Sequence, residues 1–385
     1  MIDIETKYFN LNRILLLIIG LWPYQQSNFT RLQFICLSCI LTTHVIFQCT
    51  IFISQKCTPD LITKVLSSIF FYLLFVIKYN MFSVKAVKDL LEELLHVYNG
   101  LIDKTEIAIV DEYGRNSKRY TIALTIFAVI IMFAFIVASF WSNILNIFFP
   151  TNVSRSHHLL IMTEYFFDDE EYVYFILFHS IASMCIGTTT AVATGTMFLS
   201  YLQHVCGMFK IASYRIQCAM STDMLQNINL RKQILIFKSL ICAVNIHREA
   251  MKLSKHLQYS CETMMFFLVL FGVVSLSLNL FRIASTEEVI LPFLGASAAI
   301  LYMFLANYIC QIVMNHNHDV YVTAYNARWY VAPLHIQRMI LFLLQRQSKT
   351  FNLGVGGLFI ASIECFATLV KTSISYFTVI YSTRK

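Results

Sequence analysis

Long apolar stretches separated by short polar and charged segments make up most of this chain of 385 residues. A helix needs about 20 mostly apolar residues to cross a lipid bilayer. Seven stretches have this character: 33–53, 61–82, 120–148, 172–205, 261–281, 290–314 and 357–381. The fourth is longer than one crossing requires, so we expect it to tilt or to continue as helix beyond the membrane. The pattern predicts an all-α, polytopic membrane protein with seven transmembrane helices, forming one domain over residues 1–385.

Further segments between the crossings also have helical periodicity. Residues 84–98 and 230–256 combine this periodicity with mixed charge, and residues 334–346 are amphipathic. The glycine-rich segment 354–357 predicts a break, so the seventh helix is split into a cytoplasmic part and a membrane part. Near the start of the chain, the short apolar stretch Ile14–Trp22 is followed by no small-residue cleavage site. We therefore expect an interfacial or re-entrant segment there.

The basic residues are distributed unevenly between the two sets of loops. The segment before the first crossing and every second loop after it hold 21 Lys and Arg, whereas the other loops and the carboxyl terminus hold 5. Loops rich in Lys and Arg stay in the cytoplasm. The pattern predicts a cytoplasmic amino terminus and an extracellular carboxyl terminus. A G-protein-coupled receptor has its amino terminus outside, so this class is disfavoured.

Composition and motifs exclude several other classes of protein. Hydrophobic residues make up 57% of the chain and charged residues 13%, too few charges for a soluble domain. The net charge of +7 is accounted for by the cytoplasmic loops, and no basic stripe suggests nucleic-acid binding. No paired catalytic groups or metal-ligand spacing stand out, so we predict neither an enzyme nor a cofactor. The sequon at Asn152 lies in a predicted outer loop and is a predicted glycosylation site.

Small polar residues recur at helical spacing along the last crossing. Thr368, Thr372, Ser375 and Thr383, with Val379 among them, fall on one face of a helix. The hydroxyls can bond back to their own helix, which would make this a polar packing face. The alternative is a water-lined ion path that narrows at an apolar ring formed by Val379. Periodicity alone leaves both interpretations open.

A set of short sequence strings occurs together in the carboxyl-terminal third. Ala324-Tyr325 and Trp329-Tyr330 follow the sixth crossing, Gly356-Gly357-Leu358-Phe359 opens the seventh, and the run from Phe366 to Phe377 lies within it. This combination resembles the insect odorant receptors, and the opening from Asn10 to Pro23 is similar to their hymenopteran branch. Gustatory receptors usually end with a Gln-Phe pair that is absent here, so we rank them second.

The resemblance implies a ligand-gated, nonselective cation channel of four subunits. An odorant-binding chain of this kind pairs with a shared co-receptor in the plasma membrane of olfactory sensory neuron dendrites. Segments 230–260 and 315–356 would contribute a cytoplasmic subunit anchor. The family's second gate position is commonly apolar but is Thr383 here, which fits a subunit that borrows its gate from its partners. The expected pore and gate residues are Thr372, Ser375, Tyr376, Val379 and Thr383.

The resemblance and the membrane depth of the aromatic residues also indicate a pocket for a small apolar ligand. It would lie in the outer halves of the second, third, fourth and sixth crossings. The expected lining residues are Phe71, Phe75, Ala134, Ala138, Trp141, His179 and Tyr302.

Overall fold

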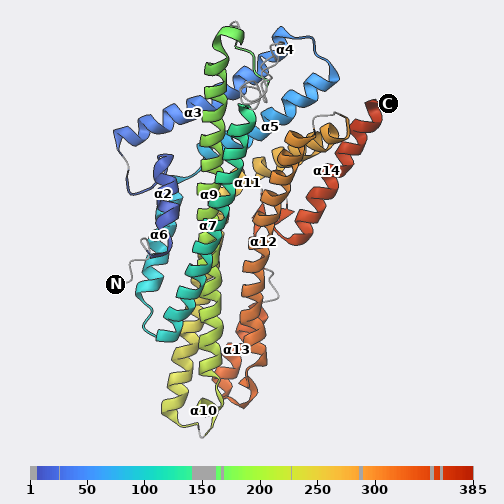
Figure 1. The fold of residues 1–385 in the computed structure, drawn as a ribbon. Coiled ribbons are helices and arrows are strands. Elements are labelled where there is room, and N and C mark those ends of the chain that lie inside the picture. Colours follow the sequence, from blue (N-terminus) through green and yellow to red (C-terminus); the bar gives the residue numbers. More distant parts are fainter. Residues whose placement is uncertain are drawn as a thin grey trace.

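The fold is an elongated bundle of helices (Figure 1). The structure, a computed structural model, describes residues 7–25, 27–140, 162–165, 169–226, 228–285, 289–346, 351–355 and 359–384. In chain order its elements are α2 (Asn10–Ile18), α3 (Asn28–Cys49), α4 (Ile51–Ser54), α5 (Pro59–Met81), α6 (Val84–Asn99), α7 (Lys104–Ser139), α9 (Asp169–Ala219), α10 (Thr222–Leu225), α11 (Leu230–Ser285), α12 (Ile290–Asn326), η1 (Trp329–Val331), α13 (Leu334–Arg346), β1 (Gly354–Val355), β2 (Phe359–Ile360) and α14 (Ile363–Arg384).

Among the described residues, seven helices are long and apolar enough to cross a membrane: α3 with α4, α5, α7, α9, α11, α12 and α14. This confirms the predicted number of spanning helices. Four of them extend beyond the predicted apolar stretches. α7 begins at Lys104, well before the predicted start at residue 120. α9 continues to Ala219, α12 continues to Asn326, and α11 joins the predicted helix 230–256 to the crossing 261–281 without interruption. At 1.5 Å per residue, α9 is about 76 Å long, more than twice the hydrocarbon thickness of a bilayer.

The starts of the helices follow from local capping residues. Ser27 and Thr30 form a reciprocal capping box at the start of α3. Thr58 accepts a hydrogen bond from the Leu61 amide, and Pro59 occupies the first position of α5. Asp103 caps α7 in the same way, by accepting from the Thr105 amide. These side chains satisfy amide groups that a helix amino terminus leaves without a partner.

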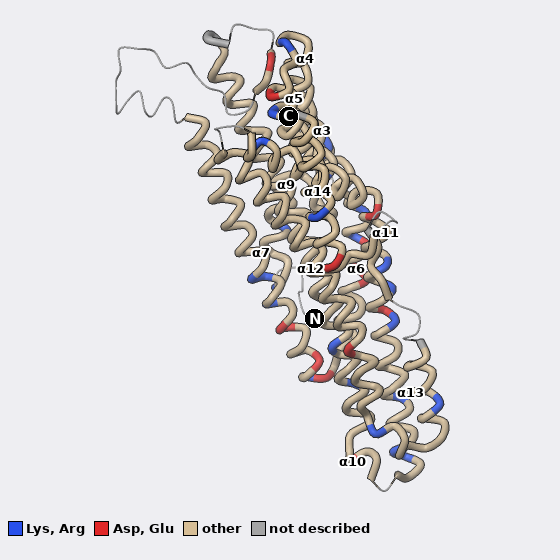
Figure 2. Tube along the Cα trace, turned by 90° about the vertical axis from the view of Figure 1, so that its right-hand side faces the viewer, with Lys and Arg blue, Asp and Glu red and all other residues tan. Residues whose placement is uncertain are grey.

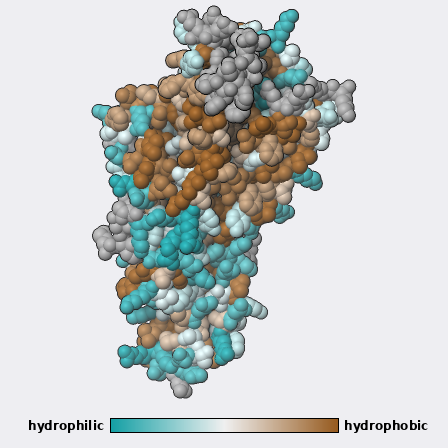
Figure 3. All heavy atoms as spheres, in the orientation of Figure 1, coloured by the Kyte–Doolittle hydropathy of each residue, from teal (hydrophilic) through white to brown (hydrophobic). Residues whose placement is uncertain are grey.

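Polar and apolar surfaces divide the molecule along its length. The upper half of the view carries a broad apolar band, and polar residues dominate below it (Figure 3). Most Lys, Arg, Asp and Glu lie in the lower half, around α6, α10 and α13 (Figure 2). The extensions of α9, α11 and α12 carry the fold into this charged end. The carboxyl-terminal end of α14 lies in the upper part of the molecule, away from α10 and α13 (Figure 1).

α9 lies at the centre of the bundle and packs against α7, α11, α12 and α5. Its buried side chains include Met197, Tyr201, Val205 and Phe209, all at most 1% exposed. These residues repeat every four positions, which places them on one face of the helix. α14 instead packs against α11 and α12 only at the margin of the bundle. Its remaining face is uncovered in a single chain.

The expected segment near the start of the chain is a short helix, α2, packed against α9 and α7. Asn12 donates a hydrogen bond to Ser200 Oγ (2.9 Å), and Ser117 donates to the same atom (2.7 Å). Leu16 is buried while Ile18 is 57% exposed, so the helix has one protein-facing side and one open side. α2 ends in a Schellman motif, in which Gly20 adopts a φ of +71°.

The predicted break before the last crossing contains a small antiparallel strand pair. Gly354 pairs with Ile360 and Val355 pairs with Phe359. The pair separates α13 from α14, as the predicted split of the seventh helix requires. Two-residue strands leave no periodicity to read, so the sequence indicated the break and not the pairing.

Candidate functional site

A cavity of about 260 Å³ lies between α5, α7, α9, α11 and α12. From α5 it is lined by Phe71, Phe75 and Lys78, whose spacings of four and three place them on one helical face. Most of the remaining wall is apolar and rich in methionine, including Met184, Met197, Met264, Met265 and Met303. Methionine side chains are flexible and polarisable, so such a wall adapts to ligands of different shape.

The aromatic side of the cavity depends on a glycine in α9. Phe71 and Phe75 meet edge to face, with ring centroids 4.9 Å apart. The Phe75 ring lies directly over Gly187, where an added Cβ would come within 2.1 Å of Phe75 Cδ2. No Cβ atom approaches a ring carbon so closely, so only glycine leaves room for this ring position. Gly187 therefore sets the depth of the cavity at Phe75.

Lys78 is the charged residue in this cavity wall. Its side chain is 3% exposed, and its ammonium donates a hydrogen bond to the Ala191 carbonyl (3.3 Å). The ammonium also lies 4.2 Å from the ring centroid of Tyr302, a cation–π contact. The described residues that line the cavity include no Asp or Glu.

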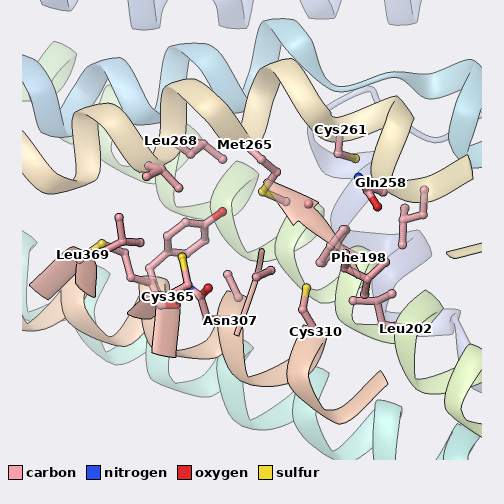
Figure 4. A pocket seen from close by; sticks show the side chains of 18 of the residues that line it. Phe198, Leu202, Gln258, Cys261, Met265, Leu268, Asn307, Cys310, Cys365 and Leu369 are labelled. Atoms are coloured by element: carbon pink, nitrogen blue, oxygen red, sulfur yellow. Dashed lines mark hydrogen bonds between the residues drawn. The ribbon is translucent and has the colours of Figure 1, made fainter. Parts of the chain in front are cut away.

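A second cavity of about 50 Å³ adjoins the first and extends toward α14. The two share Phe198, Met265, Leu268 and Tyr302 as wall residues. The smaller cavity is also lined by Cys365 and Leu369 of α14, and Figure 4 shows these two side chains on the same side as Leu268. The shared wall residues and two side chains of the last helix therefore border the same cavity.

The hydroxyls of α14 bond back to their own helix. Thr372 donates to the Thr368 carbonyl (2.8 Å), Ser375 to the Lys371 carbonyl (3.0 Å) and Thr383 to the Ile380 carbonyl (2.9 Å). Tyr376 and Val379 are 54% and 59% exposed. The buried face of α14 is fixed to α11, where Ser277 donates to the Ser373 carbonyl (3.0 Å). The predicted polar stripe is therefore on the uncovered face rather than in the packed one.

Comparison with known families decides the class of protein. A family model described as "7tm Odorant receptor" matches residues 58–374. The chain belongs to the odorant receptor family. This is a family of receptors rather than of enzymes, and the seven apolar helices make this odorant receptor a membrane protein.

Solved structures share the fold over nearly its whole length. An insect olfactory receptor from Machilis hrabei in complex with eugenol is similar at a TM-score of 0.78 and 14% identity, covering 99% of this chain and 100% of that chain. A second structure of that olfactory receptor gives a TM-score of 0.75 at 14% identity, with 97% of each chain covered. At this identity the likeness concerns the fold. No curated protein matches the sequence.

The structure brings together part of the predicted ligand site. Phe71, Phe75 and Tyr302 line the larger cavity of this odorant receptor. Ala134 and Ala138 do not line it, because that side of α7 is exposed. An apolar membrane helix with a weak hydrophobic asymmetry gives little indication of which side faces the protein. Trp141, and likewise Asn152 with its predicted glycan, lies outside the described residues.

His179 belongs to a different cluster from the cavity. Its Nδ1 lies 2.5 Å from the Tyr165 hydroxyl and its Nε2 lies 3.2 Å from the Thr43 hydroxyl. The ring of His44 packs edge-on against it, with centroids 5.4 Å apart. These contacts join α9 to α3, so we assign His179 to packing and not to ligand contact. The sequence analysis did not include Lys78 among the lining residues. Its helical spacing from Phe71 and Phe75 places it on the same face of α5 and could have indicated it.

Proposed function

We propose that this odorant receptor is the ligand-binding subunit of an odorant-gated, nonselective cation channel that assembles with the odorant receptor co-receptor. The observation that carries the proposal is the wall shared by the two cavities. A ligand in the larger cavity would press on Phe198, Met265 and Tyr302, which also bound the smaller cavity beside α14. Ligand occupancy and the position of α14 are thereby coupled through packed side chains.

The ligand site comprises the cavity residues that the structure groups around Phe71, Phe75 and Tyr302. A cavity of about 260 Å³ suits a small, mostly apolar odorant, since an engineered cavity of roughly 150 Å³ already holds benzene. Eugenol, bound by the Machilis hrabei receptor, is a molecule of this general kind. The site does not include Ala134, Ala138 or His179.

We place the charged end of the bundle in the cytoplasm, with segments 230–260 and 315–356 contributing the subunit anchor. The proposal puts the amino terminus inside, the carboxyl terminus outside and the protein in the plasma membrane of olfactory sensory neuron dendrites. It is supported by the concentration of Lys and Arg at one end of the molecule. Antibody access to terminal epitope tags in intact cells tests this orientation.

Electrical recording tests the channel function. Three sets of cells are compared: one expresses the chain with the co-receptor, one the chain alone, and one the co-receptor alone. A broad panel of odorants is applied to each. We expect odorant-evoked cation current that needs both chains. Surface delivery without any evoked current across the panel would contradict the proposal.

We also propose that Val379, which is 59% exposed on α14, closes the pore. Replacing Val379 with serine should raise the basal current several-fold, because an apolar constriction excludes water and a hydroxyl does not. The matched control is Ile374→Ser, which makes the same chemical change at a position 47% exposed elsewhere on α14. An unchanged basal current in Val379→Ser, with normal surface delivery, would remove Val379 from the gate.

The cluster around His179 predicts an effect on stability rather than on odorant affinity. We expect His179→Ala to lower the free energy of unfolding by about 1–3 kcal/mol, since it leaves the buried Tyr165 hydroxyl without its partner. The half-effective odorant concentration should change less than about threefold. Thermal unfolding in detergent and dose–response recording measure the two quantities. A large affinity loss with unchanged stability would return His179 to the ligand site.

A further inference from the structure

The ammonium of Lys78 occupies an unusual position for a lysine in a membrane helix. Lysines near the ends of such helices normally extend toward the bilayer surface. Lys78 lies in the last turn of α5, yet its side chain points into the protein and is 3% exposed. It is held between the Ala191 carbonyl of α9 and the Tyr302 ring of α12. The charge therefore belongs to the cavity and not to the membrane surface.

The contacts of Lys78 with the protein leave its charge incompletely paired. An ammonium carries three donors, and the Ala191 carbonyl accepts one of them at 3.3 Å. The Tyr302 ring face offers a diffuse negative potential and no acceptor atom. Buried charges are normally paired with an opposite charge. Around this cavity the described wall supplies none.

Polar groups and open space meet on the α9 side of the same cavity. Thr188, Ala191 and Gly195 line it, and their spacings of three and four place them on one helical face. The Thr188 hydroxyl is buried and has no hydrogen-bond partner among the described residues. At Gly195 an added Cβ would lie 3.8 Å from Lys78 Nζ, so the absence of a side chain there leaves the ammonium open on one side.

We propose that the larger cavity selects ligands with a carboxylate head group, which pairs with Lys78, and an apolar tail that packs among Phe71, Phe75 and the methionines. This rests on the proposed function in that it takes the cavity as the ligand site. The carboxylate supplies the missing charge, and the Thr188 hydroxyl is available as a second donor. A neutral odorant would leave the ammonium as it is and gain less from the site.

Direct binding tests the proposal. The full-length receptor is reconstituted in nanodiscs, and apparent Kd values are obtained from ligand-induced shifts in unfolding temperature. The probes are octanoate, decanoate and hydrocinnamate, each compared with its methyl ester. We expect at least one acid to bind about ten- to a hundredfold more tightly than its ester, the range typical of a hydrogen bond to a charged group. Lys78→Met should abolish this preference, so that each acid binds no more tightly than its ester.

The controls separate this inference from the proposed function. Lys64→Met removes a lysine from the same helix outside the cavity and should keep the acid preference. If none of the three acids binds the wild-type receptor more tightly than its ester, the proposal is wrong, and no variant is needed to show it. The proposal would also be overturned if borohydride traps octanal on Lys78 and no acid binds. Lys78 would then serve an aldehyde ligand and not a carboxylate. Binding needs no current, so a receptor that binds acids but conducts nothing would refute the channel and leave this inference standing.

Discussion

Replacing Glu106 with alanine should destabilise the receptor by about 3–5 kcal/mol, the range for removing one partner of a buried ion pair. Arg215 donates to both carboxylate oxygens of Glu106, from Nε at 2.6 Å and from Nη2 at 2.8 Å. Its Nη1 also donates to the Cys242 carbonyl of α11 (2.9 Å). One guanidinium therefore joins α7, α9 and α11, and the variant would leave its charge partly buried without a counter-ion.

Denaturant unfolding in detergent measures this effect, with surface expression as a second readout. The control is Glu92→Ala, which breaks an exposed pair with Lys88 (3.8 Å) and should cost less than about 1 kcal/mol. The double variant Glu106→Met with Arg215→Met should recover much of the loss, because it removes both charges. A double variant no more stable than Glu106→Ala would contradict the assignment of the loss to an unpaired charge.

Adding one methyl group at Gly187 should weaken odorant binding by roughly tenfold or more, since overpacking forces neighbouring side chains out of their positions. The new Cβ overlaps the Phe75 ring, and the ring must then move into the cavity that it now borders. Stability should fall less than binding does, because the cavity gives the ring somewhere to go. Odorant dose–response curves and unfolding temperatures measure the two effects.

Gly207→Ala is the matched control for the Gly187 variant. Both glycines lie in α9, so the change in helix propensity is the same. A Cβ at Gly207 would lie 3.5 Å from Tyr113, an ordinary contact, and Gly207 does not line the cavity. We expect normal odorant responses from this variant. Equal losses in both variants would show that the effect comes from α9 as a whole and not from Phe75.

The sequence predicted the number of spanning helices well, but it gave little indication of which side of each helix faces the protein. Hydropathy located the seven spanning helices because each needs about 20 apolar residues. It pointed to Phe71 and Phe75, which line the larger cavity, since their spacing is helical and aromatic side chains stand out in α5. Ala134 and Ala138 do not line that cavity, and small apolar side chains on a uniformly apolar helix give no indication of which face meets the protein. Lys78 lines the cavity and His179 does not, and the sequence could not distinguish the two positions because the partners of a buried polar group come from other helices.

The hydroxyls of α14 have a consequence for what this helix presents to its surroundings. A hydroxyl has one hydrogen to donate and two lone pairs that accept. From Ser375 to Thr383 each serine and threonine hydroxyl donates its hydrogen to a carbonyl of its own helix. What these four hydroxyls leave on the exposed surface is their oxygen lone pairs. The serine and threonine oxygens of this segment therefore form a row of acceptors, which suits contact with a cation better than contact with an anion.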